Sequence, residues 1–390
     1  MKVINESMKN IEMSGGLYEI FQKSLKMEQQ GRKIYHMEIG KPDFDSPKDA
    51  KNATIKALNE GFVHYTAMAG IDELRQAIAE KEYRENNIVA DPNNEIMVTA
   101  GACEALISIM LSILDPGDEL IIPSPYFSAY NDMAIISGIK IVEVPLKFEN
   151  AFVLDVNDIS DKITNKTKAI LINTPNNPTG AIIELEDLEK IAKLSIEKDL
   201  LVISDETYDQ FLFEGKHVSI STLDGMKERT IVINSTSKTF SMTGWRIGYA
   251  IGPAHLIQYL NKVHQNMSTC ASSFAQVGAA YAFKHEKSFT GNMVEEFHKR
   301  RDIVIDGLSK IDKIQFVVPK GAFYIFPRIK DLNMSSLEFC NRLLDETGIA
   351  VVPGNAFGDS GEGFIRIAYA QSQEQLKEAM IILKDFVEKL

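Results

Sequence analysis

The chain has 390 residues, of which 45% are hydrophobic and 25% are charged. This composition is that of a folded globular protein, and the length allows one large domain and a smaller one. A net charge of -12 provides no basic face for nucleic acid or for anionic lipid, so we expect neither nucleic acid nor membrane as a partner.

The N-terminal region and the cysteines indicate the compartment. The first thirty residues mix charged and amide side chains with isolated apolar ones and lack the apolar core of a signal peptide. No later run has the length and hydrophobicity of a membrane span, which predicts a cytoplasmic protein. Cys103, Cys270 and Cys340 are too widely spaced for a CxxC metal site or a disulfide framework, so we expect reduced thiols and no metal centre.

Between residues 46 and 284, short apolar runs alternate with amphipathic stretches. This pattern is typical of an α/β fold with a mainly parallel sheet that is covered by helices on both faces. The expected strands cover residues 96–99, 119–122, 169–172, 200–203 and 231–233. A crossover helix is indicated between the third and fourth strands by the helical spacing of Leu188, Ile191, Ala192 and Ile196.

A small-residue loop follows the first expected strand. Gly101-Ala102-Cys103-Glu104 precedes a helix that we expect to begin near Ala105. Because a helix N-terminus and its free N–H groups attract anions, the main chain of Ala102 and Cys103 is a candidate phosphate site. The Cys103 thiol has no histidine close by in sequence, so we interpret it as a small buried thiol rather than a nucleophile.

Polar and aromatic side chains follow the next three strands. Tyr126 is either a core aromatic or a residue that stacks on a planar ring. The segment 173–180 contains Asn-Asn-Pro-Thr-Gly, which predicts a turn, and its Asn177 carries an amide that can donate to a ring oxygen. Asp205 and Tyr208 follow the 200–203 strand, where they offer a carboxylate for a positively charged group and a hydroxyl donor beside the Asn177 amide.

The last expected strand leads into the most informative segment. Ser235-Thr236-Ser237-Lys238 follows residues 231–233, and Arg246 lies eight positions beyond Lys238. Open α/β sheets bind ligands at the carboxyl ends of their strands. An amine that can condense with an aldehyde, beside a hydroxyl and a guanidinium that can hold a phosphate, predicts a Schiff-base lysine and pyridoxal 5'-phosphate as cofactor.

After residue 285 the pattern changes to a smaller α+β domain. We expect a long charged helix around residues 295–306, strands at 315–318, 322–325 and 364–367, and a terminal helix. Arg366 is a charged residue inside an apolar run, so it needs an anion, either a substrate carboxylate or an internal acidic side chain. Gly40 allows its backbone to approach the same carboxylate, or simply forms a turn.

These residues together resemble the class I aminotransferases, within the fold type I pyridoxal phosphate enzymes. The likeness covers essentially the whole chain and rests on Gly40 to Phe44, Tyr65 with residues 70–75, the Gly101 loop, residues 176–180, residues 205–208, the Ser235 to Gly248 segment and Arg366. It implies a large cofactor-binding domain over residues 46–284, a small domain over 285–390 and an N-terminal arm, residues 1–45, that packs on the small domain.

The resemblance also implies a role for each candidate residue. Lys238 would be the Schiff-base lysine and proton shuttle, Asp205 would bind the pyridine nitrogen, and Tyr208 and Asn177 would bind the ring oxygen. Tyr126 would stack on the ring, and Ser235, Arg246 and the Ala102 and Cys103 amides would hold the phosphate. Arg366 and Gly40 would bind the substrate carboxylate, and Tyr65 would reach the phosphate of the neighbouring subunit in a homodimer with shared active sites.

The expected reaction is ping-pong transfer of an amino group from an L-amino acid to a 2-oxo acid such as 2-oxoglutarate. A β-lyase, a racemase or a cyclising synthase on the same scaffold is the alternative, and a cofactor-sensing regulator is a more distant one. Bacterial aspartate aminotransferases often carry a lysine at the position of Cys103 and a proline at that of Met68. These differences, with Gly15-Gly16 in the N-terminal segment, leave dicarboxylic, aromatic and neutral donors open.

Overall fold

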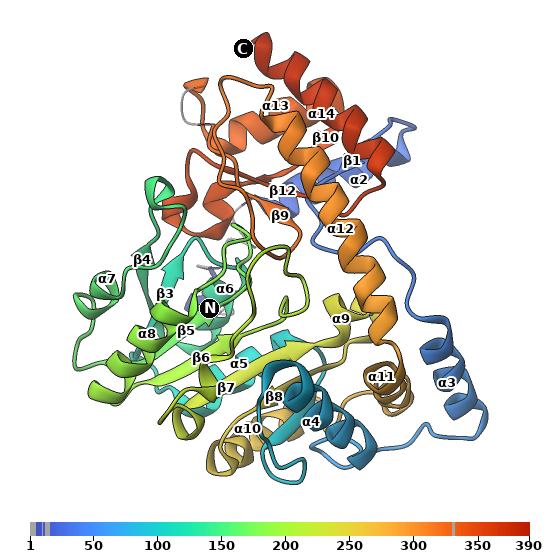
Figure 1. Cartoon of the computed structure of the whole chain (residues 1–390), viewed down its shortest axis with the longest axis vertical. Helices are drawn as coiled ribbons and strands as arrows, with labels where there is room; N and C mark the ends of the chain where they lie inside the picture. Colours follow the sequence, from blue (N-terminus) through green and yellow to red (C-terminus); the bar gives the residue numbers. More distant parts are fainter. Residues whose placement is uncertain (1–4, 10, 12–15, 330–331) are drawn as a thin grey trace.

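The computed structural model describes residues 5–9, 11, 16–329 and 332–390. A seven-stranded sheet forms the centre of its larger part (Figure 1). In spatial order its strands are β2 (Ile96–Thr99), β8 (Gly248–Ile251), β7 (Thr230–Ser235), β6 (Leu201–Asp205), β5 (Thr167–Asn173), β3 (Glu119–Ser124) and β4 (Lys140–Pro145). All neighbouring pairs are parallel except those that β8 makes with β2 and β7. The predicted mainly parallel α/β fold is confirmed.

Helices cover both faces of this sheet because its strands alternate apolar side chains between the two faces. Ile231 and Ile233 of β7 pack with α5 (Ala102–Ile113), α6 (Ala129–Ser137) and α10 (Ala254–Met267), whereas Val232 faces α4 (Asp72–Asn86) and α11 (Ser273–His285). On this second face α8 (Leu185–Glu197) covers β5 and β6, as the spacing of Leu188 and Ile191 predicts. The remaining helices of this part are α3 (Lys48–Asn59), α7 (Val156–Ser160) and α9 (Thr236–Thr239).

The sequence analysis did not predict two strands of the large sheet, β4 and β8. The β4 strand has mostly exposed and half-buried positions, and β8 begins at a glycine, so neither is a fully apolar run. Gly248 has a positional reason, because a side chain there would overlap the backbone of residues 101 and 102. The edge strand β2 and the loop after it therefore pack directly against β8.

The second part of the molecule stands above the sheet and is reached through the long helix α12 (Lys287–Leu308) (Figure 1). It contains a three-stranded sheet of order β11 (Val352–Pro353), β12 (Ile365–Ala368) and β9 (Tyr324–Ile325), covered by α13 (Ser336–Thr347) and α14 (Gln373–Glu388). The expected strand at 315–318 does not form. Only Gln315 makes a bridge, to Arg328, and Val317 and Val318 line a cavity instead.

The N-terminal segment crosses to this second part. It contains α1 (Glu6–Lys9), α2 (Leu17–Gln29) and β1 (Tyr35–His36), and β1 pairs in parallel with β10 (Ile349–Ala350). The chain then returns to the large sheet through α3. The division at residues 45 and 284 stays a prediction, but this pairing brings Gly40 between the two parts.

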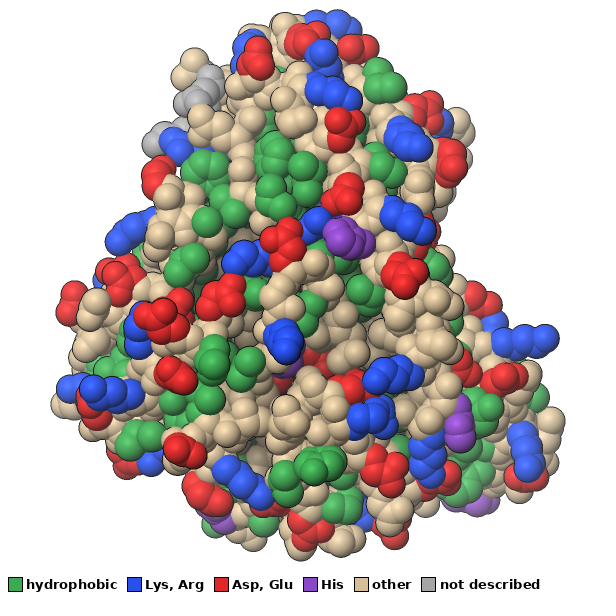
Figure 2. Space-filling model, viewed as in Figure 1, with side chains coloured by type: hydrophobic (Ala, Val, Ile, Leu, Met, Phe, Trp, Pro, Cys, Tyr) green, Lys and Arg blue, Asp and Glu red, His purple; other side chains and the backbone are tan. Residues whose placement is uncertain are grey.

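Two further features are the charge of the surface and the hydrophobicity of the helices. Figure 2 shows acidic and basic side chains interspersed over the face in view. Within the described residues, no helix combines the length and the hydrophobicity that a membrane crossing requires.

Candidate active site

A crevice of about 400 Å³ lies at the carboxyl ends of the central strands, between the large sheet, the N-terminal segment and the small sheet. Asn173, at the end of β5, stands beside Asp205, at the end of β6, and Lys238 follows the end of β7. The predicted site residues that line this crevice are Gly40, Ala102, Cys103, Asn177, Asp205, Tyr208, Ser235, Lys238, Arg246 and Arg366. Parallel pairing places the ends of β5, β6 and β7 at one edge of the sheet, whereas Gly40 reaches the crevice from the N-terminal segment and Arg366 from the small sheet.

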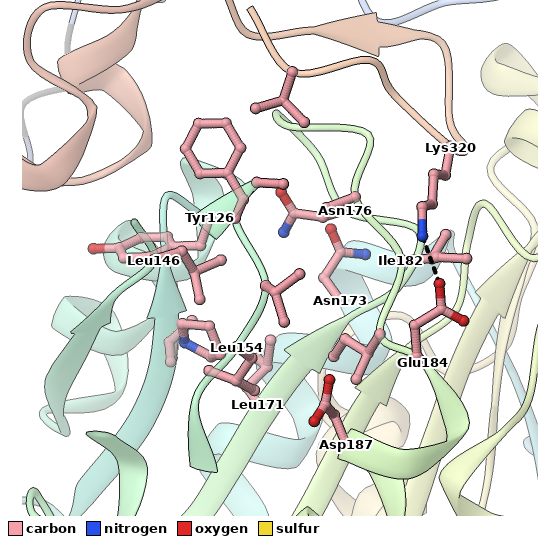
Figure 3. Close-up of a pocket in the computed structure, with 18 of the residues that line it drawn as sticks. Tyr126, Leu146, Leu154, Leu171, Asn173, Asn176, Ile182, Glu184, Asp187 and Lys320 are labelled. Carbon is pink, nitrogen blue, oxygen red and sulfur yellow. Dashed lines mark hydrogen bonds and ion pairs between the residues drawn. The ribbon is translucent and has the colours of Figure 1, made fainter. Parts of the chain in front are cut away.

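Tyr126 lies outside this lining. It borders a second, smaller cavity of about 110 Å³, where Figure 3 shows it with Leu146, Leu154 and Leu171. Its hydroxyl donates to Glu143 Oε1 over 2.8 Å. The crevice is lined instead by Phe127, the next residue in the turn that follows β3. The crevice is thus lined by the residue next to Tyr126 and not by Tyr126 itself.

Tyr65 also lies outside the crevice. Its side chain is 85% exposed, on a surface that carries other exposed apolar residues such as Val63 and Met68. Among the described residues, none covers the ring of Tyr65 enough to bury it. Such a patch is typical of a surface that another subunit covers.

Lys238 lies on the single-turn helix α9, for which Ser235 is the N-cap and accepts a hydrogen bond from the Ser237 amide over 3.3 Å. The Lys238 amine donates to the Gly40 carbonyl. Burial lowers the pKa of Lys238 to about 8, with the guanidinium groups of Arg366 and Arg246 also lowering it, against the opposing effects of Cys103 and the Asp205 carboxylate. The uncharged amine, which can attack a carbonyl carbon, is therefore more abundant near neutral pH than in an ordinary lysine.

Ala102 begins α5 directly after Gly101, three residues earlier than the sequence predicts. Gly101 has a φ of 86°, and a side chain on it would overlap the Arg246 guanidinium. Arg246 donates to the carbonyls of Thr243 (3.0 Å) and Ala100 (3.4 Å), and among the described residues no carboxylate pairs with it. A helix N-terminus beside an unneutralised guanidinium forms an anion site.

Asp205 presents the opposite charge within the same crevice. The carboxylate is 4% exposed and accepts hydrogen bonds from the hydroxyls of Tyr130 (2.6 Å) and Thr207 (2.8 Å). Burial raises the pKa of Asp205, and these hydrogen bonds oppose that rise. Within the described part of the chain no cation pairs with this carboxylate, so it is positioned to receive a positive group.

Arg366, on β12, is 3% exposed and also lacks a carboxylate partner in the described structure. Its Nη1 donates to Asn177 Oδ1 over 3.1 Å and its Nη2 to the Glu38 carbonyl over 2.5 Å, while its buried Nε has no partner. The guanidinium lies between the rings of Tyr324 and Phe357. The sequence analysis expected Arg366 to bind either a substrate carboxylate or an internal acidic side chain. Among the described residues no acidic side chain pairs with it.

Several residues of the site went unrecognised in the sequence. Tyr130 binds Asp205, and the Tyr324 hydroxyl forms a 2.7 Å hydrogen bond with the hydroxyl of Tyr208. A side chain on Gly40 would overlap that Tyr324 hydroxyl, which explains the glycine. Tyr130 follows two other aromatic residues, Tyr126 and Phe127, and Tyr324 belongs to an apolar strand, so neither has a local signal. An apolar part of the crevice wall is formed by Leu17, Tyr18, Phe21, Ile39, Leu106 and Phe127.

Comparison with known proteins agrees with this geometry. Residues 32–383 match the family model described as aminotransferase class I and II. The chain belongs to the class I and II aminotransferase family. It is 47% identical over 350 residues to an aspartate aminotransferase of Pyrococcus abyssi, covering 89% of this chain and 90% of the relative. It is 45% identical to aromatic-amino-acid aminotransferase 2 of Thermococcus litoralis, over 89% and 90% of the two chains.

The solved structures give the same result. The aspartate aminotransferase of Thermus thermophilus, crystallised with maleate, matches this aminotransferase with a TM-score of 0.94 and 36% identity over 99% of this chain and 100% of that one. The predicted family, fold and enzyme class are therefore confirmed. The alternatives of a lyase, a racemase, a synthase or a regulator gain no support from these relatives.

Enzymes of this family use pyridoxal phosphate, and the crevice of this aminotransferase fits that molecule. The anion site beside Arg246 suits the phosphate, the Lys238 amine suits the aldehyde, and the buried Asp205 carboxylate suits a protonated ring nitrogen. Of the departures from the aspartate enzymes, Cys103 lines the crevice and is exposed there, so the prediction of a buried thiol is wrong, and Met68 is an exposed residue outside the crevice. Gly16 is the N-cap of α2, and Gly15 lies outside the described residues.

Proposed function

We propose that this aminotransferase binds pyridoxal 5'-phosphate and moves the amino group of an apolar or aromatic L-amino acid to 2-oxoglutarate in a ping-pong reaction. The bound cofactor would supply an aldehyde for the amino group and a ring that withdraws electrons from the substrate. The observation that carries the proposal is the position of Lys238. Its amine, with a lowered pKa, lies in one crevice with two guanidinium groups that have no carboxylate partner.

Lys238 has two tasks in this proposal. Its amine holds the cofactor before substrate arrives and then, released, moves a proton to and from the substrate α-carbon. Asp205 keeps a positive charge on the ring nitrogen, and its own direction is fixed by Tyr130 and Thr207. The Asn177 amide and the Tyr208 hydroxyl donate to the ring oxygen.

The phosphate and the ring face are held by separate elements. The Ser235 hydroxyl, the Arg246 guanidinium and the amides of Ala102 and Cys103 bind the phosphate. Phe127 takes the ring-stacking position that the sequence had suggested for Tyr126, because Phe127 lines the crevice.

Substrate carboxylates bind at Arg366. A guanidinium takes a carboxylate through two parallel hydrogen bonds, which aligns the α-carbon with the Lys238 amine. The buried Nε of Arg366 that lacks a partner, and the Gly40 backbone beside it, support this assignment.

The donor's side chain lies against the apolar wall formed by Leu17, Phe21, Ile39 and Phe127. The lining cations of the described residues are Lys41, Lys238, Arg246 and Arg366, and the last three are assigned above. Lys41, which is exposed at the rim, is left for the distal carboxylate of 2-oxoglutarate. Many aspartate enzymes carry a lysine at the position of Cys103, which has no positive charge to offer. An apolar side chain therefore loses less hydration free energy on entering the crevice than the carboxylate of aspartate does.

A panel of amino donors against 2-oxoglutarate tests this proposal. We expect kcat/KM for phenylalanine, tyrosine and leucine to exceed that for aspartate, with glutamate formed from 2-oxoglutarate as the measured product. Lys41→Ala should raise the KM for 2-oxoglutarate and leave that for phenylalanine unchanged. Aspartate as the best donor would contradict the donor class, and no amino transfer to any acceptor would contradict the proposal.

We further propose a homodimer in which Tyr65 binds the phosphate in the neighbouring subunit. The exposed position of Tyr65, away from its own crevice, supports this. Tyr65→Phe mixed with Lys238→Ala should form heterodimers in which one site carries both changes and the other neither. Activity restored in the mixture would agree with donation across the interface, whereas a mixture no better than its components would exclude it.

A further inference from the structure

The turn that carries Asp205 and Tyr208 has a second, inward face. Asp205, Thr207 and Tyr208 line the crevice, whereas Glu206 and Asp209 point into the protein and are 0% and 2% exposed. The turn itself is short: the Asp209 amide donates to the Glu206 carbonyl over 2.9 Å. Whatever fixes the two inward carboxylates therefore also fixes the two outward side chains.

Asp209 is held by α4. The Lys81 amine forms ion pairs with Asp209 Oδ2 and, over 3.0 Å, with Glu82 Oε1. Asn86 donates to the same Asp209 oxygen over 2.9 Å and to Glu82 Oε2 over 2.7 Å. The Tyr249 hydroxyl of β8 completes this ion cluster with a 2.6 Å bond to Glu82 Oε1. The Lys81 side chain is 3% exposed, so the cluster is closed to solvent.

Glu206 is held independently of α4. The hydroxyls of Ser204 and Ser219 each donate to Glu206 Oε1 over 2.7 Å, and His217 Nε2 lies 2.8 Å from Glu206 Oε2. The side chain of His217 is 5% exposed. The turn is thus anchored at two points, of which the Asp209 anchor alone depends on a distant helix.

The energetics of the ion cluster do not favour a role in stability alone. Burial raises the pKa of Asp209, but the charges of Lys81 and His217 outweigh it and lower that pKa to about 2, so this carboxylate is ionised. Taking such charges out of water is costly, and apolar residues of similar size are often as good for stability. The second oxygen, Asp209 Oδ1, is buried without a hydrogen-bond donor, which adds to the cost. An ion pair fixes the orientation of the Asp209 side chain, which apolar packing would not do.

We propose that Lys81 is a positioning residue for amino transfer: by holding Asp209 it fixes the turn from which Asp205 and Tyr208 reach the cofactor. Lys81 does not line the crevice and takes no part in proton transfer. The inference rests on the proposed function, because it assigns to Lys81 the geometry of residues to which that function gives their roles. It adds α4, a helix on the opposite face of the sheet from α5, to the elements that determine the rate (Figure 1).

Two variants test this role. Lys81→Met removes the charge at similar length but leaves Asp209 buried and unpaired, which destabilises the fold. The double variant Lys81→Met/Asp209→Asn removes the two charges of the Lys81–Asp209 pair, leaves Glu82 with its hydrogen bonds from Asn86 and Tyr249, and is the decisive protein. A matched control is Lys190→Met, since Lys190 is half-exposed on α8 and pairs only with Glu186 and Asp187 of its own helix.

We expect the folded double variant to lose about 10- to 100-fold in kcat while the KM for donor changes little, since small misplacements of reacting groups cost up to about 10²-fold. The absorbance of bound pyridoxal phosphate should titrate at a shifted pH, because the distance of Asp205 from the ring nitrogen changes. Lys81→Arg should recover most of the kcat, and Lys190→Met should equal the wild type in both measurements.

The outcomes separate the two proposals. A double variant with wild-type kcat and wild-type cofactor titration would overturn the role of Lys81 while leaving the proposed function intact. If neither Lys81 variant folded, judged by circular dichroism and thermal unfolding of the cofactor-free protein, the cluster would be structural and the inference wrong. A wild-type protein that bound no pyridoxal phosphate and transferred no amino group would contradict the proposed function itself, and this inference with it.

Discussion

The crevice and the ion cluster are two charged regions on opposite sides of one turn, and they differ in how their charges are paired. In the crevice, as far as the described residues extend, Arg246 and Arg366 donate to neutral oxygen atoms and Asp205 accepts from neutral donors. In the cluster, Lys81 pairs with the carboxylates of Asp209, Glu82 and, over 4.0 Å, Glu85, and its own side chain is only 3% exposed. Charges left without partners are available to a ligand, whereas charges paired inside the protein hold its shape. Four experiments test this contrast.

The largest effect is expected for Lys238→Ala. Turnover should fall by about 10⁴-fold, because one amine both holds the cofactor and moves the substrate proton. Borohydride treatment of the wild type with pyridoxal phosphate, followed by peptide mapping, should place the reduced adduct on Lys238. An adduct on another lysine, such as Lys81, would reverse the assignment of the two regions.

Asp205→Asn should reduce kcat by about 10²–10³-fold, the cost of removing one preorganised electrostatic partner. The dissociation constant of pyridoxal phosphate should change far less, because the phosphate contacts of Arg246 and α5 remain. Steady-state kinetics and fluorescence titration measure the two quantities. Equal losses in both would show that Asp205 maintains the site as a whole rather than the charge of the ring.

Arg366→Lys should raise the KM for donor and acceptor alike by about 30-fold, since a two-pronged contact becomes a point charge and this costs about 2 kcal/mol. The control is Arg229→Lys, because Arg229 pairs with Asp199. The control should leave both KM values unchanged. A stability loss in Arg366→Lys with unaltered KM would make Arg366 a structural residue like those of the ion cluster.

The smallest effect concerns pH. The pKa of Lys238 is lowered to about 8, so the neutral amine that attacks the cofactor aldehyde becomes abundant as the pH rises through about 8. The rate at which cofactor-free protein takes up pyridoxal phosphate should therefore rise with pH and level off above about 9. A rate that continued to rise toward pH 10.5 would mean that the amine is paired and charged, as Lys81 is.

The sequence by itself determined the class of fold and the chemistry of the crevice. Buried parallel strands are short apolar runs, and each is followed by the polar residues that its end presents, so Asp205, Lys238 and the Gly101 loop are visible from local pattern. The family resemblance extends over the same residues, and the comparisons confirm it. The sequence also showed that Arg366 needs an anion, because it interrupts an apolar strand.

Only the tertiary structure decided which way individual side chains point and which distant residues meet. Tyr126 and Phe127 are both aromatic, and the turn of the backbone after β3 places Phe127 in the crevice. Tyr130 and Tyr324 bind site residues through contacts of long sequence separation that leave no local pattern. Lys81 on an amphipathic helix resembles any solvent-exposed lysine, and its partner Asp209 lies 128 residues away. Such pairings follow from the packing of α4 on the sheet, which no stretch of the sequence encodes alone.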